Sequence, residues 1–426
     1  MLFKSKEKTS PVPSIREYAA SEVVVEDQSS VQFDHGIDRD SQGSSFLAYF
    51  NVVCVVAGTG ALSLPYALRQ GGWIDTGVIL IKCLYHNGRT RLSSYQEVAN
   101  DAFGAIGSWV AFFFTVVILL GVSVIFMMLS GANIFAICQG TSAELTQEIW
   151  TIICCAAVAV PFVFFRSMKE VGFLSAFGSL ATVVTILIVL VESVKDKKNH
   201  PDVHTDSVIW DQFPIALSSI VFSFGGNPVY AHVEAGMRRP QDWNKVVFAG
   251  LTTCVFMYLL IAVPGYAIYG NEVLSPAYDS IPDGAAKIAA QIIITLHVIL
   301  ACPILLTALS LDLEKVFRIS DFHHSKWVEW VLRVILRIIL IVAVAAIAIK
   351  VPFFGDFLSL LGAFSNCGLV LIFPVAFYLR LTGIRNKPIY ELFMCSLIIV
   401  LGIVGLIFGT ISAVRSLIAD FQGSPQ

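Results

Sequence analysis

Long stretches without charged residues alternate with short polar segments along the chain. An α-helix rises about 1.5 Å per residue, so roughly 20 apolar residues are needed to cross about 30 Å of hydrocarbon. Stretches near that length recur throughout the sequence, which predicts an all-α bundle of membrane-spanning helices instead of a single anchor. We expect about ten full spans, at residues 46–70, 105–137, 148–165, 171–193, 212–236, 245–269, 285–311, 327–349, 353–379 and 391–417.

One apolar segment, Thr76–Tyr85, has only about half the length of a spanning helix and carries Lys82. It lies where a second helix is expected. Cytosolic loops are enriched in Lys and Arg, and this rule tests whether the segment still crosses. If the N-terminus is cytosolic and the segment crosses, the inner loops hold twice as many basic residues as the outer ones. The charges therefore predict about eleven crossings, one of them by a truncated second helix.

The composition agrees with a membrane protein and narrows the functions open to it. Of the 426 residues, 56% are hydrophobic and 14% are charged, against roughly a quarter charged in soluble domains. The net charge of −3 is small and the basic residues sit in separate loops, which argues against a nucleic-acid-binding patch. The nine cysteines have no zinc-binding spacing, and no G-x-x-x-x-G-K-[ST] phosphate loop is present. We therefore expect no enzyme activity, no metal or cofactor, and no use of ATP.

Polar residues fill both ends of the chain. Residues 1–44 contain no apolar signal segment, so we expect a disordered cytosolic tail there. The membrane domain is expected at 45–418, and 419–426 form a short C-terminal tail.

The first expected span is interrupted at mid-membrane depth by Gly58, Thr59 and Gly60, followed by Pro65. Glycine lowers helix propensity and proline removes a backbone donor, so N–H and C=O groups lose their partners there. Hydrocarbon cannot satisfy those groups. A ligand, an ion or a neighbouring helix has to do so.

A second interruption, at Gly225 and Gly226 with Pro228, lies within the span expected at 212–236. Small residues also let helices pack closely, and either break taken alone is open to that interpretation. Two breaks at matching positions, in the first and the sixth helix, favour inverted repeats with a binding site at the midplane between them. Half-helix N-termini suit a carboxylate and exposed carbonyls suit an ammonium, so a zwitterionic amino acid fits both.

The run Phe50–Trp73 resembles the opening helix of the amino acid/auxin permease family. The similarity continues through Tyr95–Gly104, Phe222–Asn227 and His232–Met237, and covers nearly all of 45–418. The resemblance points to fungal-type members and to the vesicular and vacuolar branch of the family. The resemblance implies an inverted-repeat bundle similar to the sodium-symporter fold, which moves neutral amino acids with a proton or sodium gradient.

The chain departs from this family between Trp73 and Thr76. Relatives carry a full second helix at this point, and most of that helix is missing here. The second helix belongs to the scaffold of the family and not to its substrate site, yet its loss would open the first repeat.

The resemblance also implies which residues bind substrate. Ala57, Gly58, Thr59 and Gly60 match the unwound first helix of the family, where backbone groups and a hydroxyl hold the carboxylate. The second break is matched by Ser223, Phe224, Gly225, Gly226 and Asn227. Carbonyl groups there are expected to face the amine. Phe224 is expected to form a wall of the side-chain pocket, although an aromatic residue in a helix more often only packs.

Five residues are candidates for ion or proton coupling: Asn51, Cys54, His232, Glu234 and His297. Cys54 stands where sodium-coupled relatives carry an asparagine, and a thiol is a poor ligand for a hard cation, so a proton gradient is favoured over sodium. Asn51 could still reach a cation. Ionisable groups near the membrane interior mark a pathway by default.

Each ionisable candidate also has a structural interpretation. Glu234 could be an interfacial carboxylate paired with Arg238 at i+4. An unperturbed histidine suits proton transfer, which makes His297 a candidate, but an interior histidine is more often simply hydrogen-bonded.

The expected function is proton-coupled symport or antiport of neutral amino acids by a monomer that alternates access around the midplane site. Its partners would be a small amino acid substrate and the lipid bilayer. The expected location is the vacuolar or another internal membrane, or the plasma membrane, with the N-terminus cytosolic. Two alternatives stay open: a sensor that binds an amino acid without moving it, and a transport-defective variant that lacks most of the second helix.

Overall fold

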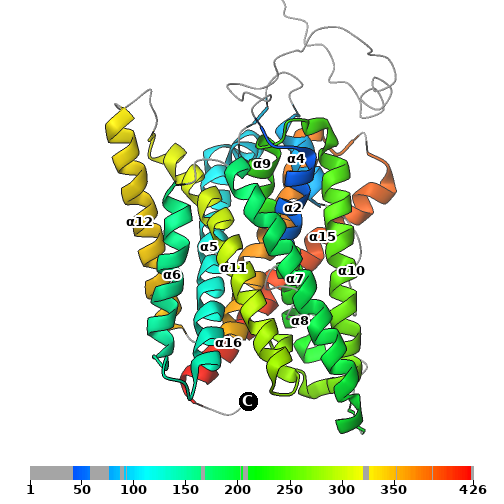
Figure 1. Ribbon diagram of the computed structural model, residues 1–426. Helices are drawn as coiled ribbons and strands as arrows, with labels where there is room; N and C mark the ends of the chain where they lie inside the picture. Colours follow the sequence, from blue (N-terminus) through cyan, green and yellow to red (C-terminus); the bar gives the residue numbers. More distant parts are fainter. Residues whose placement is uncertain are drawn as a thin grey trace, which may run out of the picture.

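The computed structural model describes residues 42–57, 76–86, 91–92, 94–164, 168–201, 203–204, 210–319, 326–351, 353–385 and 387–423. Within these ranges the chain is almost entirely helical (Figure 1). The longer helices are α2 (Ser45–Val56), α5 (Tyr95–Cys138), α6 (Gln147–Phe164), α7 (Met168–Asp196), α8 (Phe213–Ser223), α10 (Trp243–Tyr269), α11 (Ala285–Val316), α12 (Lys326–Lys350), α14 (Phe373–Thr382), α15 (Ile389–Val404) and α16 (Thr410–Phe421). The shorter ones are α4 (Thr76–Leu84), α9 (Asn227–Ala235) and α13 (Phe354–Leu361).

Seven helical stretches among the described residues are long and apolar enough to cross a membrane. They are Tyr95–Cys138, Ser175–Asn199, Pro240–Glu272, Ala285–Val316, Trp327–Lys350, Phe354–Thr382 and Ile389–Phe421. The three other expected spans correspond to helices that are shorter when taken singly: α2, α6, and the pair α8 and α9. Every expected span therefore has a helical counterpart, and the chain is an all-α multi-pass membrane protein.

The outer faces of the bundle carry large apolar side chains. Trp327, Val342, Phe393 and Val400 are each more than half exposed. Such a surface is stable against hydrocarbon, which cannot satisfy polar groups. The interior holds one large apolar cluster to which α2, α5, α10 and α11 all contribute.

The helix that contains Tyr95 begins earlier than the sequence predicted. Its N-cap is Ser94, whose hydroxyl accepts a hydrogen bond from the Glu97 N–H group at 3.4 Å. Gly104 then interrupts the helix with φ 68° and ψ −163°, a conformation that glycine adopts without steric cost. The predicted start at residue 105 is therefore the start of the straight apolar part of α5, and residues 95–103 form a preceding helical segment.

The shortened segment is a helix of nine residues, α4. At 1.5 Å per residue it spans about 14 Å, roughly half of the hydrocarbon thickness. Leu80, Cys83 and Leu84 are buried, and the helix packs against α9 and α14. What the structure describes of the second helix is thus a packed piece of the bundle.

Two helices contain π-helical segments. Gly362–Ile372 lies between α13 and α14, and Gly405–Gly409 lies between α15 and α16. A π-helical turn widens the backbone and often accompanies a functional site. The first of these segments packs against α8 and so borders the second break.

The two interrupted helices enter the bundle from opposite ends. In Figure 1, α2 runs from the upper end toward the middle, α8 rises from the lower end, and α9 continues to the upper end. Gly43, just before α2, is tied to the end of α9, because its N–H donates to the Gly236 carbonyl (2.9 Å) and its carbonyl accepts from the Arg238 N–H (2.8 Å). The start of one broken helix is therefore fixed to the end of the other.

Candidate functional site

The first broken helix ends at Val56 in the centre of the bundle. Ala57 follows as the C-cap, fully buried, and its N–H donates to the Val53 carbonyl at 2.7 Å. The rest of the expected first break, Gly58, Thr59 and Gly60, lies outside the described residues. Helix α2 therefore ends at Val56, just before these residues, and the first break itself stays a prediction.

The second break is described completely. Helix α8 ends at Ser223, and α9 starts at Asn227, with Pro228 in its first turn. Between them the backbone tightens, because the Gly225 N–H donates to the Phe222 carbonyl (3.0 Å) and the Gly226 N–H to the Phe224 carbonyl (2.9 Å). The end of α8 presents carbonyl groups and the start of α9 presents N–H groups, so the two ends of this gap have opposite partial charge.

The two glycines of the second break also permit close contacts. A side-chain carbon added at Gly225 would lie 2.3 Å from Asn366 Nδ2, and one added at Gly226 would lie 2.4 to 2.5 Å from atoms of the Tyr230 ring. The two interpretations of these glycines therefore apply together. They interrupt the helix, and they leave room for neighbouring side chains.

One tyrosine links the two breaks. The hydroxyl of Tyr258, on α10, lies 2.6 Å from the Val56 carbonyl and 2.6 Å from the Ser223 carbonyl. These two carbonyls are the last ones of α2 and α8. Both belong to the acceptors that a helix end leaves without an internal partner, and the one proton of this buried hydroxyl can be donated to either of them.

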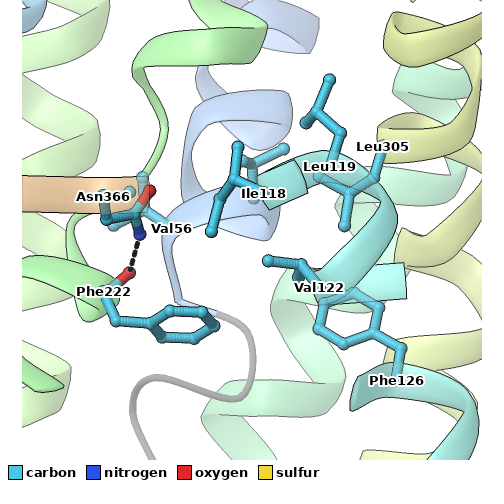
Figure 2. Close-up of a pocket in the computed structure, with 10 residues that line it drawn as sticks. Val56, Ile118, Leu119, Val122, Phe126, Phe222, Leu305 and Asn366 are labelled. Carbon is cyan, nitrogen blue, oxygen red and sulfur yellow. Dashed lines mark hydrogen bonds between the residues drawn. The ribbon is translucent and has the colours of Figure 1, made fainter. Parts of the chain in front are cut away.

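A cavity lies between the breaks and is lined mainly by apolar side chains. Its described lining residues are Val55, Val56, Ile118, Leu119, Val122, Phe126, Phe222, Gly225, Leu305 and Asn366. Figure 2 shows the side chains from α5 and α11 on one side and Asn366 with Phe222 on the other. None of the described lining residues is charged, and Asn366 supplies the polar side chain. Such a space accepts an apolar group next to a small number of hydrogen-bonding atoms.

The sequence expected Phe224 in the wall of this pocket. The structure places the Phe224 ring against Tyr258, with ring centroids 5.3 Å apart and planes at 77°. Phe222, two residues earlier, lines the cavity instead. Phe224 acts by packing against the tyrosine that joins the breaks, and Ser223 acts through its backbone carbonyl. Asn227 donates from Nδ2 to the Leu369 carbonyl at 3.4 Å.

Three of the five coupling candidates come together where α2, α7 and α11 meet. Asn51 accepts a hydrogen bond from the Ser175 hydroxyl at 2.5 Å. Next to it, Gly178 separates Cys54 from His297: a carbon added at Gly178 would lie 3.0 Å from Cys54 Sγ and 3.2 Å from His297 Nδ1. We call this group the α2–α7–α11 cluster.

His297 is fully buried within the cluster. Its Nδ1 lies 2.6 Å from the Gly178 carbonyl and 2.9 Å from the Thr182 hydroxyl. Nε2 has no hydrogen-bond partner among the described residues. The ring is therefore hydrogen-bonded through Nδ1. Nε2 is available for a further hydrogen bond as far as the described residues are concerned.

Glu234 lies apart from this cluster, at the end of α9. Its carboxylate is fully buried and accepts hydrogen bonds from Arg91 Nε (2.6 Å) and from the Tyr85 hydroxyl (2.6 Å). Arg91 also donates to the Ala231 carbonyl at 2.8 Å. Both partners belong to the connector after α4. The sequence did not predict these hydrogen bonds to the connector. It suggested Arg238, at i+4, as the partner of Glu234.

His232 has a partner on another helix. Its Nε2 lies 3.2 Å from Oδ1 of Asp312 on α11, and both side chains are buried. The contact joins α9 to α11 at the end of the bundle where α9 stops. His232 and Glu234 thus place two side chains of the same short helix against two different neighbours.

Several residues of this site were not singled out in the sequence. Tyr258 lies among other aromatic residues of an apolar helix, a pattern that predicts only a packing role. Asn366 and Asp312 carried a usable signal, because a polar side chain within an apolar span is costly and marks function by default. Arg91 was counted only as a loop charge, since its partner is 143 positions away in sequence.

The comparisons with known proteins agree on the class of protein. Residues 41–415 match the family described as transmembrane amino acid transporter protein. The chain is 25% identical over 412 residues to amino acid transporter AVT1B of Arabidopsis thaliana, covering 91% of this chain and 73% of the relative. It is 27% identical over 407 residues to amino acid transporter AVT1I of the same plant, covering 90% of this chain and 98% of the relative. These relatives come from a plant, whereas the sequence resemblance pointed to fungal-type members.

Solved structures show the same fold at low sequence identity. A Na⁺-coupled sialic acid symporter superposes with a TM-score of 0.53 at 12% identity, covering 90% of this chain and 91% of the symporter. MhsT in complex with L-phenylalanine gives a TM-score of 0.51 at 14% identity, covering 87% of this chain and 99% of MhsT. The bundle is therefore similar to the inverted-repeat fold of these symporters.

Proposed function

Because this chain belongs to the family of transmembrane amino acid transporters, we propose that it moves neutral amino acids by alternating access, driven by a proton gradient. The observation that carries the proposal is the meeting of the two broken helices at Tyr258, with a cavity beside them. Broken helices that face each other at mid-bundle are the usual construction of a transporter's substrate site.

The neutral class of substrate is supported by the cavity wall. A charged side chain of a substrate would need a partner of opposite charge, because burying an unpaired charge is very costly. The described lining residues provide no such partner. The helix ends at the second break can instead serve the two charges that every amino acid shares, with carbonyl groups for the ammonium and N–H groups for the carboxylate.

We assign the coupling proton to His297. The imidazole joins α11 to α7 through the Gly178 carbonyl and lies beside Cys54 of the first broken helix. A sodium ion prefers oxygen ligands, and a thiol and an imidazole suit it poorly. Protonation of His297 would place a cation between these helices and strengthen its bond to the carbonyl, so the proton state would favour one arrangement of α2 against α7 and α11.

The buried contacts of α9 form the proposed cytosolic closure. Arg91 and Tyr85 hold Glu234, Asp312 holds His232, and Gly43 holds the backbone after α9. In alternating access one end of the bundle opens while the other stays closed. Opening of this end would require α9 to separate from these partners.

The proposed location is the vacuolar membrane, on the basis of the resemblance to the vesicular and vacuolar branch. We propose a monomer as the transporting unit, because both breaks and the cavity lie within one chain. A fluorescently tagged full chain, imaged with a vacuolar and a plasma-membrane marker, tests the location.

The transport proposal is tested with the purified full chain in proteoliposomes. We expect a pH gradient to drive uptake of labelled leucine, phenylalanine or glutamine, a protonophore to abolish it, and a sodium gradient to have no effect. Lysine and glutamate should not compete. No gradient-dependent uptake across a broad panel of neutral amino acids would contradict the proposal.

The role of His297 is tested in the same vesicles with His297→Gln, which keeps hydrogen-bonding capacity but does not titrate. We expect uptake driven by the pH gradient to fall to the level without a gradient, while exchange of internal for external leucine persists. His200→Gln serves as the control, because His200 contacts Asp196 near the end of α7, away from the site. Gradient-driven uptake by His297→Gln equal to that of the unaltered protein would exclude this role.

A further inference from the structure

Asn366 lies in the π-helical segment Gly362–Ile372 and is only 1% exposed. Its Nδ2 donates to the Phe222 carbonyl at 3.4 Å, and Figure 2 shows this bond at the edge of the cavity. Its Oδ1 has no hydrogen-bond partner among the described residues. Native proteins rarely leave a buried amide oxygen without a partner, so this atom requires an explanation.

The surroundings of Asn366 are built to bring its amide to the break. Gly225 has no side chain, and an added carbon there would lie 2.3 Å from Nδ2 and 3.0 Å from Cγ of Asn366. The bond from Nδ2 to the Phe222 carbonyl fixes which side of the amide faces α8. Oδ1 is the amide atom that has no partner among the described residues, in a side chain that lines the cavity.

The local electrostatics select the kind of group that fits. The end of α8 directs its carbonyls toward this region, which gives it partial negative charge. An amide oxygen is a further acceptor. A donor that carries positive charge is favoured here, and an ammonium is the cationic donor that an amino acid supplies.

The opposite wall of the cavity favours an apolar side chain on the bound amino acid. Ile118, Leu119, Val122 and Phe126 of α5 and Leu305 of α11 present apolar side chains to the cavity. An apolar side chain gains free energy by leaving water for such a wall. The two sides of the cavity therefore suit the two ends of one small molecule.

We propose that Asn366 is a substrate-contacting residue, whose Oδ1 accepts a hydrogen bond from the ammonium of an amino acid with an apolar side chain. The inference rests on the proposed function and adds to it a binding residue on a third helix, outside the two breaks. Binding would give Asn366 Oδ1 a partner, which the described residues do not provide.

Equilibrium binding to the detergent-purified full chain tests this inference without requiring transport. Two ligands are compared: leucine, and 4-methylpentanoate, which has the same carbon skeleton and carboxylate but no ammonium. In Asn366→Leu, which keeps the volume and removes the amide, we expect leucine to bind roughly 10- to 100-fold more weakly, as for loss of a hydrogen bond to a charged group. Binding of 4-methylpentanoate should be unchanged.

The matched control is Asn133→Leu. Asn133 is also a buried asparagine, but its Nδ2 donates to Thr295 (3.0 Å) and its Oδ1 accepts from Tyr278 (2.8 Å), away from the cavity lining. This variant should lose stability without changing the ratio of the two affinities.

The possible outcomes separate the two proposals. If the unaltered protein binds leucine and Asn366→Leu binds it equally well, the role of Asn366 is overturned and the proposed function stands. If both ligands weaken by the same factor, Asn366 acts only on structure, and the inference is again overturned. If the unaltered protein binds no neutral amino acid at all, the proposed function fails together with the inference.

Discussion

The next described helices along the chain after the two broken ones, α4 after α2 and α10 after α9, differ threefold in length. Helix α4 has nine residues, and α10 has 27. The long helix carries Tyr258 to both broken helices, whereas the short one contributes its buried end and the connector that holds Glu234. The comparison indicates that the site depends on α10 for the contact between the breaks, and on the α4 region for holding α9 and packing against α14.

The largest expected effect concerns the α4 side of this comparison. Arg91→Ala would remove the guanidinium that lies 2.6 Å from the fully buried Glu234 carboxylate, and breaking a buried ion pair costs about 3–5 kcal/mol. We expect a marked fall in the melting temperature of the detergent-purified protein. Adding Glu234→Gln should restore much of it, because the buried negative charge is then removed.

The control for Arg91 is Lys195→Ala, which removes an exposed ion pair with Glu192. Exposed pairs contribute about 0–1 kcal/mol, so this variant should melt close to the unaltered protein. If Arg91→Ala were as stable as this control, the contact between Arg91 and Glu234 would not stabilise the fold. The connector after α4 would then not anchor α9.

A smaller effect is expected on the α10 side. Tyr258→Phe removes the hydroxyl that serves the Val56 and Ser223 carbonyls, and we expect a loss of about 1 kcal/mol of stability, typical of one hydrogen bond. Leucine affinity should fall several-fold as well, because the two breaks lose their shared contact. The measurements are thermal melting and equilibrium binding.

Tyr266→Phe provides the control within the same helix. Its hydroxyl donates to Asn271 in an exposed position at the end of α10. Leucine binding should not change in this variant. Equal binding by Tyr258→Phe and the unaltered protein would show that α10 does not set the geometry of the site.

The smallest effect is expected in the loop after α10. Partial burial raises the pKa of the Asp279 carboxyl above its usual value, against a weaker opposing influence of Lys287. A raised folded-state pKa means that the protein loses stability as the pH rises from the ordinary aspartate value through the folded-state value. Asp279→Asn should therefore be slightly more stable than the unaltered protein at neutral pH.

The pH dependence gives this last prediction its check. The difference in melting temperature between Asp279→Asn and the unaltered protein should shrink as the pH falls toward 4 and grow as it rises, since protonated aspartate and asparagine are both neutral. If Asp279→Asn instead melts below the unaltered protein at neutral pH, Asp279 is stabilised by a cation and its pKa is not raised.

The sequence predicted the spanning helices well because each of them is encoded by a largely continuous run of apolar residues. The second break was predicted for a local reason too, since Gly225, Gly226 and Pro228 weaken the helix whatever surrounds them. The start of α5 was missed because residues 95–103 are more polar than a span, although Ser94 provides an N-cap.

The candidate site was predicted less completely because its contacts join distant parts of the chain. The Tyr258 hydroxyl finds its partners on α2 and α8, and Arg91 finds Glu234, only after the helices pack. Asn366 could have been noticed as a polar side chain in an apolar run. Its free acceptor, however, follows from the bond that its Nδ2 makes to Phe222, which no local pattern encodes.

The central claim is that this chain, with its short α4, completes a transport cycle around the site between the breaks. Leucine counterflow tests it most directly, because exchange requires the site to open to both sides but needs no driving gradient. Proteoliposomes that contain the full chain and are loaded with unlabelled leucine should transiently accumulate external labelled leucine. Leucine binding without any counterflow would contradict the claim and favour an amino acid sensor.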